Sequence, residues 1–383
     1  MIEIEINIMP KKTCFIMTDA VSFNVLCKGQ LEYFKESGFL DMTLICGGSA
    51  EEIEYLKGRN IGRVIKLPLI RKPSIINDLI CLTSLTLFLS YNRFDLVVYS
   101  TPKALLLGSI ASFCSLQNRR VAVVQGRVYE NYQGLKKKIF QSFDKISFAA
   151  SNEVLFVSNS LLEKCREEQL INNKKSKVLG SGSFNGVNTE LFKPITLEER
   201  SELRNKLNIP LDNYIVCVVG RVCKDKGIED INNLAEKLEN RNIKFLFVGS
   251  FEDEVSRDIV ERIVGNKQGY YIPHTSEIHE IFQCSNLHLF LSYREGFGNV
   301  AIEAASCGIP TFAYDVVGIK DSVKDNISGQ RFKFKDIDSV AEAIDLTFAS
   351  NKVESYYESA REWAVEFFDR KKVWRDYLDF YKK

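Results

Sequence analysis

The sequence predicts an α/β protein with two doubly wound domains, and three observations support that prediction. The chain has 383 residues, which is enough for two domains of ordinary size. Short apolar runs of strand length alternate with helical patterns, which is typical of parallel sheets covered by helices on both faces. The alternation stops at residues 192–201 and then restarts, so we expect the linker there.

Each half supplies its own set of strands. In the first half, the expected strands are residues 13–17, 42–46, 94–99, 121–124 and 154–157. In the second half, they are residues 214–219, 244–248, 269–272, 287–291 and 311–314. Between the first two strands, residues 26–37 are expected to form a helix that ends at Gly38. Residues 354–381 are expected to form one long amphipathic helix rich in aromatic residues.

Composition excludes several classes of protein. The formal net charge of +1 argues against general binding of nucleic acid. The ten cysteines lack metal-ligand spacing, and several lie inside apolar runs, so they are interpreted as small hydrophobes in a reducing cytoplasm. Residues 1–5 do not have the pattern of a signal peptide. Residues 79–91, the most membrane-like stretch, are too short to span a bilayer and are expected to form a buried helix.

The most informative stretch is residues 287–310. It is expected to contain a strand, a turn with Gly296 and Gly298, and a helix over residues 300–307 that closes at Gly308. A helix start presents unpaired N–H groups and partial positive charge, so the amides near Gly298, Asn299 and Val300 are candidates for binding a phosphate. Glu295 in the turn and Glu303 in the helix could both face one cleft.

A second candidate segment, residues 220–227, directly follows the first strand of the second half. It begins Gly220-Arg221 and ends Lys226-Gly227, and its glycine spacing fits neither a Walker loop nor a dinucleotide fingerprint. Arg221 could fork onto phosphate oxygens while Lys226 supplies a point charge. Ordinary surface charge is the alternative interpretation.

Polar residues also follow the strands of the first half. Ligands of parallel sheets bind beyond the carboxyl ends of the strands, although each such residue alone is more often part of a polar turn. The candidate acceptor or cleft residues are Ser22, Lys28, Gly29, Thr101, Gln125, Arg127 and Glu130.

Two charged segments have competing interpretations. The three lysines at 136–138, followed by Ile139 and Phe140, could rest on an anionic membrane surface or form a solvated helix face. The run Asp336-Ile337-Asp338 imitates a metal-binding Asp-x-Asp motif. It precedes a helical run at residues 339–349, so Asp338 is interpreted as the helix N-cap and no metal is assigned.

Together, the Glu-Gly-Phe-Gly turn at 295–298, Glu303, and the Ala-Ser-Cys-Gly-Ile-Pro run at 305–310 resemble the signature of family-4 glycosyltransferases, retaining enzymes of GT-B fold. The runs Phe-x4-Lys-Gly-Gln from Phe23, Thr-Pro-Lys-Ala from Thr101, and residues 180–188 resemble the branch that assembles bacterial capsules and lipopolysaccharide O-antigens. The resemblance covers essentially the whole chain.

The resemblance implies two Rossmann-like domains that face each other across a cleft. Residues 1–194 would bind the acceptor and residues 195–365 the nucleotide-sugar, with a terminal helix at about 366–383 packing back on the first domain. It assigns Glu303 to the ribose hydroxyls and Glu295 to the transferred sugar. Arg221 and Lys226, with the amides near 297–300, would bind the diphosphate. The implied catalytic residues are Glu295, Arg221 and Lys226, and the implied donor-binding residues are Glu303, Gly296, Phe297, Gly298, Asn299, Val300 and Gly220.

The implied function is retaining transfer of a sugar, of hexosyltransferase type, from a nucleotide-sugar that is expected to be UDP-linked. The acceptor would be an undecaprenyl-diphosphate-linked saccharide, and the expected location is the cytoplasm, with possible peripheral attachment to the inner face of the cell membrane. No metal or other cofactor is expected. Two positions depart from the family pattern: Gln125 replaces the usual His, and Leu291-Ser292 replaces the usual Pro-Ser. A GT-B nucleotide-sugar epimerase and a non-catalytic nucleotide-binding partner of another transferase remain alternatives.

Overall fold

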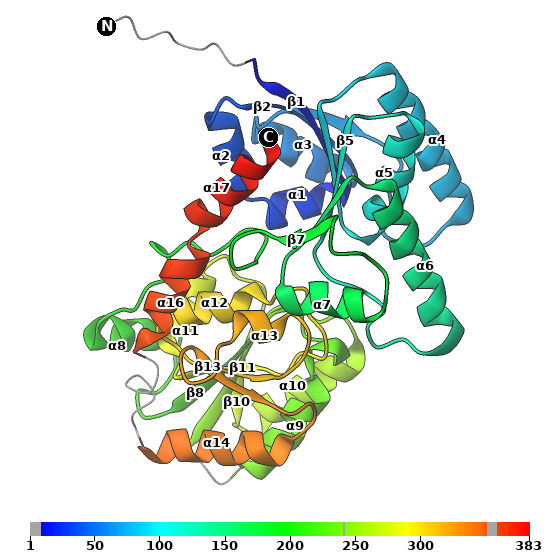
Figure 1. Cartoon of the computed structure of the whole chain (residues 1–383). Helices are drawn as coiled ribbons and strands as arrows, with labels where there is room; N and C mark the ends of the chain where they lie inside the picture. Colours follow the sequence, from blue (N-terminus) through cyan, green and yellow to red (C-terminus); the bar gives the residue numbers. More distant parts are fainter. Residues whose placement is uncertain (1–8, 240–241, 351–357) are drawn as a thin grey trace, which may run out of the picture. The chain divides into compact units, whose positions relative to one another are not determined.

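The computed structural model describes residues 9–239, 242–350 and 358–383, which form two compact units (Figure 1). The first unit comprises Met1–Asn185 and Lys371–Lys383, and the second comprises Gly186–Arg370. Both units are α/β with a parallel sheet, so the predicted pair of doubly wound domains is confirmed. The predicted lack of a signal peptide concerns residues 1–5, which lie outside the described residues.

The described part of the first unit contains a seven-stranded parallel sheet with the strand order β3-β2-β1-β4-β5-β6-β7. Its strands are β1 (Lys11–Asp19), β2 (Leu40–Gly47), β3 (Arg63–Lys66), β4 (Leu96–Ser100), β5 (Arg119–Val124), β6 (Glu153–Phe156) and β7 (Ser176–Val178). The short strands β3 and β7 at the two edges were not predicted. The strand order changes direction between β1 and β4, which are neighbours in the sheet.

Helices flank this sheet. They are α1 (Ala20–Leu26), α2 (Gln30–Glu36), α3 (Ala50–Gly58), α4 (Ile75–Tyr91), α5 (Pro102–Cys114), α6 (Gly134–Ala150), α7 (Asn159–Glu167) and α17 (Arg370–Tyr381). The last of these joins the core of the first unit through Trp374, Tyr377 and Tyr381, which pack with Phe15 and Phe34.

Two helix predictions in this unit need correction. Residues 26–37 are not one helix, because Gly29 has φ +81° and separates α1 from α2. A Cβ on Gly29 would lie 2.6 Å from the Trp374 ring, so no other side chain fits there. Residues 79–91 do lie in a helix, α4, but that helix is not buried. Only one side of α4 packs against the rest of the first unit, and large apolar residues such as Ile75 and Tyr91 are exposed.

In the second unit, the described residues form a six-stranded parallel sheet with the order β10-β9-β8-β11-β12-β13. The strands are β8 (Tyr214–Val219), β9 (Ile243–Val248), β10 (Gly269–Ile272), β11 (Leu287–Phe290), β12 (Thr311–Tyr314) and β13 (Gly329–Phe332). The helices are α8 (Leu197–Lys206), the short 3₁₀ helix η1 (Lys224–Lys226), α9 (Ile228–Lys237), α10 (Glu254–Gly265), α11 (Ile278–Cys284), α12 (Asn299–Ser306), α13 (Ile319–Ser322), α14 (Ile337–Ser350) and α16 (Ser359–Phe368). Here the order changes direction between β8 and β11.

The boundary between the units precedes the expected linker at 192–201. Val187 bridges to Asp369, and its backbone also pairs with Phe368 and Arg370, so the chain from Gly186 onward belongs with the second unit. The expected single helix at 354–381 is also interrupted. Asp369 separates α16 from α17, and residues 354–357 lie outside the described residues.

Candidate functional site

The candidate donor site is the carboxyl edge of the second sheet, where β8 and β11 lie side by side. Ligands of doubly wound sheets bind at such a point, because the connections from the two strands leave in opposite directions and open a crevice. The segment 220–227 follows β8, and the segment 291–298 follows β11. The two segments that the sequence selected therefore meet at one place.

Backbone and side-chain contacts hold these two segments together. Arg294 donates two hydrogen bonds to the Asp225 carboxylate, from Nη2 at 2.5 Å and from Nε at 3.0 Å. The Tyr293 N–H donates to the Asp225 carbonyl oxygen at 2.9 Å. Gly227 has φ +76°, and a Cβ there would lie 2.2 Å from the Leu291 carbonyl oxygen. Glycine is thus required for this close approach of the two segments.

Lys226 and Glu295, two of the predicted catalytic residues, form an ion pair across the same junction. Their side chains are 22% and 16% exposed, so the pair is partly shielded from water. An ion pair of this kind interacts more strongly than one at a fully exposed surface. The arrangement fixes the ammonium group of Lys226 beside the turn that precedes α12.

Arg221, the third predicted catalytic residue, lies at the start of the segment 220–227. Its Nη1 is 2.6 Å from Oε1 of Glu252, and this ion pair is well exposed. Glu252 was not predicted, and it raises the pKa of Arg221, whose burial acts in the opposite direction. An incoming anion would therefore compete with Glu252 for the Arg221 guanidinium.

The amino terminus of α12 has the geometry expected for binding an anion. Its N-cap is Gly298, with φ +91°, and glycine has no side chain with which to cap the helix. A Cβ at Gly298 would lie 2.7 Å from the Phe290 ring. Asn299 begins the helix and Val300 follows it, as the sequence predicted to within one residue. The N–H groups of the first turn and the helix dipole favour a negatively charged ligand here.

Glu303 lies on the first turns of α12. Desolvation raises the pKa of its carboxyl group to about 7. Within the described part of the chain, no cation or hydrogen-bond donor offsets that desolvation. Most partly buried carboxylates have such a partner, so Glu303 is a hydrogen-bond acceptor that the folded chain leaves available.

The sequence analysis missed several residues of this site. Asp225, Arg294 and Glu252 position the two segments, but their residue types and spacing carry no specific signal. Gly318, at φ +84°, is the N-cap of α13, and a Cβ there would lie 2.5 Å from the Glu295 carbonyl oxygen. A glycine that precedes a short helix is too common a pattern to have been selected.

The sequence predicted that Asp338 is the N-cap of the helix after the Asp-x-Asp run, and this prediction is wrong. Asp336, not Asp338, caps α14: its Oδ1 accepts the Ser339 N–H at 3.2 Å, and its Oδ2 accepts the Ser339 hydroxyl at 2.9 Å. Asp338 instead pairs with Lys237 at 2.7 Å. The cap differs from the prediction because α14 begins at Ile337, two residues before the start that the sequence pattern suggested.

In the first unit, the corresponding point on the sheet is the junction of β1 and β4. The Thr18 and Thr101 hydroxyls lie 2.7 Å apart, and the Thr18 N–H also donates to the Thr101 hydroxyl at 3.0 Å. Thr101 has φ +72°, which is unusual for a β-branched residue. Such strain concentrates at binding sites, where the surrounding structure enforces it. Ser22 lies nearby in sequence and donates to Asp19 at the end of β1.

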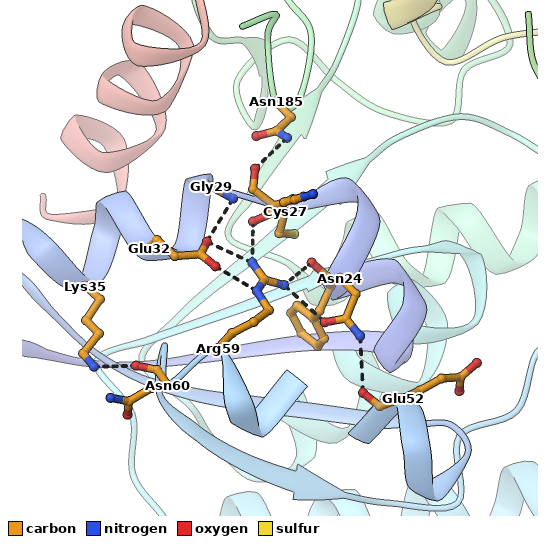
Figure 2. A network of polar contacts seen from close by, with 11 residues as sticks. Asn24, Cys27, Gly29, Glu32, Lys35, Glu52, Arg59, Asn60 and Asn185 are labelled. Atoms are coloured by element: carbon orange, nitrogen blue, oxygen red, sulfur yellow. Dashed lines mark hydrogen bonds and ion pairs between the residues drawn. The ribbon is translucent and has the colours of Figure 1, made fainter. Parts of the chain in front are cut away.

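The turn that contains Lys28 and Gly29 is held by Arg59 (Figure 2). Arg59 donates to Glu32 at 2.8 and 2.9 Å and to the Cys27 carbonyl at 3.1 Å. Glu32 in turn accepts the Gly29 N–H at 2.9 Å. The backbone of the turn is thus fixed by partly buried hydrogen bonds, while the Lys28 side chain is exposed.

Arg127 and Glu130 lie in a polar cluster after β5. The Arg127 side chain is only 1% exposed, and its guanidinium contacts Glu168 at 2.6 Å and the Cys165 sulfur at 3.4 Å. Glu130 lies 3.8 Å from Arg127, and burial raises its pKa. These contacts anchor the segment after β5 to α7. Nearby, the side-chain amide nitrogen of Gln125 is buried and has no hydrogen-bond partner among the described residues.

The helix α6 carries the three lysines at 136–138. Lys137 pairs with Glu168 at 3.0 Å, and Lys136 lies 3.8 Å from the centre of the Tyr132 ring. The same helix exposes apolar residues, among them Leu135, Ile139, Phe143 and Ile146. No described helix is long and apolar enough to pass through a bilayer.

Comparison with known proteins shows which proteins this chain is similar to. Residues 199–363 match the sequence profile of the family "Glycosyl transferases group 1". The chain is 28% identical over 361 residues to the capsular polysaccharide biosynthesis glycosyltransferase CapM of Staphylococcus aureus, and the match covers 93% of each chain. It is 26% identical to the Escherichia coli UDP-Gal:alpha-D-GlcNAc-diphosphoundecaprenol alpha-1,3-galactosyltransferase, with 79% of each chain covered.

The same conclusion holds for the fold. The structure of Anabaena HepE in complex with UDP and glucose superimposes with a TM-score of 0.78 at 18% identity, covering 97% of this chain and 99% of that one. The fold is therefore that of GT-B glycosyltransferases. The profile match at residues 199–363 and the similarity to these relatives confirm the resemblance drawn from the Glu-Gly-Phe-Gly motif.

Proposed function

We propose that this glycosyltransferase moves a sugar from a UDP-sugar to a lipid-linked saccharide, with retention at the anomeric carbon, in the assembly of a bacterial capsule or O-antigen. The observation that carries the proposal is the Glu303 carboxyl group. It lies on α12 near the amino terminus of that helix, and no partner for it is found within the described residues. A carboxylate in that position suits the paired hydroxyls of a ribose while the helix amides bind the diphosphate.

The chemistry follows from the leaving group. Negative charge grows on the departing diphosphate, so fixed cations and amides aimed at it lower the barrier. Lys226 and Arg221 lie on the segment after β8, next to the turn of Gly296–Gly298. Each cation is held by a carboxylate, Lys226 by Glu295 and Arg221 by Glu252. To bind the diphosphate, each would only exchange that carboxylate for a phosphate oxygen. We propose on this basis that no divalent metal is needed.

Names of relatives support the substrates. The Escherichia coli relative is named for a UDP-galactose donor and a diphosphoundecaprenol-linked acceptor, and CapM is named for capsular polysaccharide. We extend this donor class and this acceptor class to the present protein. The acceptor would bind at the carboxyl edge of the first sheet, near the strained Thr101.

A lipid-linked acceptor requires contact with the membrane, and we propose that α6 provides it. Exposed apolar side chains at 135, 139, 143 and 146 recur at helical spacing, with the exposed Lys138 and Lys145 among them. That combination is typical of a helix that lies on an anionic membrane surface. The protein would then act at the inner face of the cell membrane.

A donor screen tests the proposed function. Uridine, guanosine and cytidine diphosphate-sugars are added singly to the purified chain, and the melting temperature and slow hydrolysis of each donor are measured. We expect uridine diphosphate-sugars alone to raise the melting temperature and to be hydrolysed. A protein that epimerises the sugar without an acceptor, or one that binds the nucleotide but never cleaves the donor, would contradict the proposal.

A further inference from the structure

The segment between β3 and α4, residues 67–74, crosses the carboxyl edge of the first sheet. The Leu69 carbonyl oxygen lies 1.8 Å from the position that a Cβ on Gly47 would take, so the segment touches the end of β2. Arg71 then reaches Asp19, the last residue of β1, with its Nε 2.5 Å from Oδ2. The segment therefore lies where a ligand of this sheet is expected.

Lys103, one residue into α5 after β4, fixes the far end of the same segment. Its Nζ donates to the Lys72 carbonyl oxygen at 2.6 Å and to Asp78 of α4 at 2.7 Å. The strained Thr101 immediately precedes α5, so Lys103 links the segment and α4 to the end of β4. Side-chain contacts thus hold the segment at Arg71 and at Lys72.

The surface around this segment brings three cations together, Arg71, Lys72 and Lys103. Arg71 pairs with Asp19, and Lys103 pairs with Asp78. The Arg71 side chain is 69% exposed, and Lys72 is exposed as well. A diphosphate could therefore contact the outer cations without displacing a buried group.

An apolar surface begins directly beside these cations. The first two turns of α4 expose four large apolar side chains: Ile75 at 82%, Ile76 at 75%, Leu79 at 58% and Ile80 at 54%. Their spacing places them on one side of the helix. Together they form a contiguous apolar surface of the kind that marks a binding site rather than an isolated exposed residue.

We propose that residues 70–74 and the first two turns of α4 bind the lipid-diphosphate end of the acceptor. Arg71 and Lys72 would contact the diphosphate, and the isoleucines and Leu79 would cover the first isoprene units. The inference rests on the proposed function, because that function supplies an acceptor with both parts. A free phosphate would not need the apolar residues, and an apolar protein partner would not need the adjoining cations. The position at the carboxyl edge distinguishes this surface from α6.

Binding of farnesyl diphosphate tests the proposal in solution, without membrane and without sugar. Calorimetric titration compares the full chain with Lys72→Gln and with the double variant Ile76→Asn, Leu79→Asn. Leu87→Asn with Tyr91→Asn is the matched apolar control, because both residues are exposed on the same helix farther from the cations. Lys57→Gln is the matched charge control, because Lys57 is 51% exposed and pairs with Glu54 on another helix. We expect each test variant to bind roughly tenfold more weakly, and both controls to bind within about twofold of the parent chain.

Several results would overturn the inference. They are an absence of binding by the parent chain, an equal loss in the control variants, or inorganic pyrophosphate that binds as tightly as farnesyl diphosphate. Test variants that keep their affinity for farnesyl diphosphate but detach from anionic vesicles would identify the surface as a membrane contact instead. Titration of UDP into the same samples distinguishes failure of this inference from failure of the proposed function. Intact UDP binding with no farnesyl diphosphate binding refutes only the present inference.

Discussion

Lys226 and Glu295 pair across the junction between the segments that follow β8 and β11. Each side chain therefore holds the other in place before any ligand arrives. A sugar diphosphate entering this site would meet the cation first at its phosphate groups and the carboxylate at its sugar. We therefore expect Lys226 to act on the phosphates and Glu295 on the sugar, and the following predictions separate their contributions.

Glu295→Gln is expected to lower turnover while leaving nucleotide binding almost unchanged. The amide keeps the shape of the carboxylate but loses its charge, which would otherwise orient the sugar and stabilise positive charge at the anomeric carbon. We expect kcat to fall roughly 10²–10³-fold, about 2.7–4 kcal/mol in activation free energy. Steady-state kinetics and UDP titration check it together. Loss of UDP affinity with full turnover at saturation would mean that Glu295 and Glu303 have exchanged roles.

Lys226→Gln is expected to weaken binding of UDP by about 1.5–3 kcal/mol, because a charged hydrogen bond to the diphosphate is lost. The matched control is Lys224→Gln, on the same 3₁₀ helix. Lys224 is 71% exposed and pairs with Glu229 at the surface, so its loss should change the affinity little. Calorimetric titration of both variants decides the point. Equal effects would show that the segment contributes only general positive charge.

Glu303→Ala is expected to weaken UDP binding by about 1.5–3 kcal/mol, since a charged acceptor for the ribose hydroxyls is removed. Uridine diphosphate and uridine alone should lose affinity by a similar factor, because both carry the ribose, whereas inorganic pyrophosphate should not. An unchanged affinity for UDP would exclude Glu303 from the site.

Glu303 should also make the stability of the ligand-free protein depend on pH. Its pKa in the folded chain is about 7, against an ordinary 4.5, so the folded chain retains a proton that the unfolded chain releases. The free energy of unfolding should therefore fall as the pH rises from about 4.5 through 7. Glu303→Gln cannot lose this proton, so between pH 4 and pH 8 its free energy of unfolding should fall by about 1–3 kcal/mol less than that of the parent chain. Denaturant titrations at several pH values measure the difference, and parallel curves for both proteins would refute the assignment.

Activity in excess chelator is the test of metal independence. Lys226, Arg221 and the amides of α12 could neutralise the diphosphate without a metal, so we expect turnover to persist after chelation. Activity that disappears and returns with magnesium or manganese would instead show that these groups are insufficient.

The membrane proposal predicts that the protein sediments with cell membranes at low ionic strength and is released by a salt wash. Replacing Lys136, Lys138 and Lys145 with Gln should shift the protein to the supernatant, because the attraction to anionic lipid is electrostatic and screened by salt. Sedimentation of the parent chain and the triple variant measures this. A parent chain that stays in the supernatant at low salt would refute the attachment.

The sequence alone determined the fold class and selected the two segments of the candidate donor site. Hydrophobic period and glycine position are local properties, so the strands around 214–219 and 287–291 and the start of α12 near Gly298 could be predicted from them. The edge strands β3, β7 and β13 could not, because a short strand is selected by its neighbour in the sheet and hardly by its own residues.

Tertiary structure decided which side chains meet. The partners of Arg221 and Lys226, and the absence of a partner for Glu303 within the described residues, depend on segments far apart in the chain. It also decided that Gly29 interrupts a helix, since the Trp374 ring that requires a glycine there comes from the other end of the sequence. Likewise, the apolar composition of α4 indicated burial, yet the packing of the sheet leaves one side of that helix exposed. Composition fixes how apolar a helix is, but only the arrangement of its neighbours fixes how much of that surface is covered.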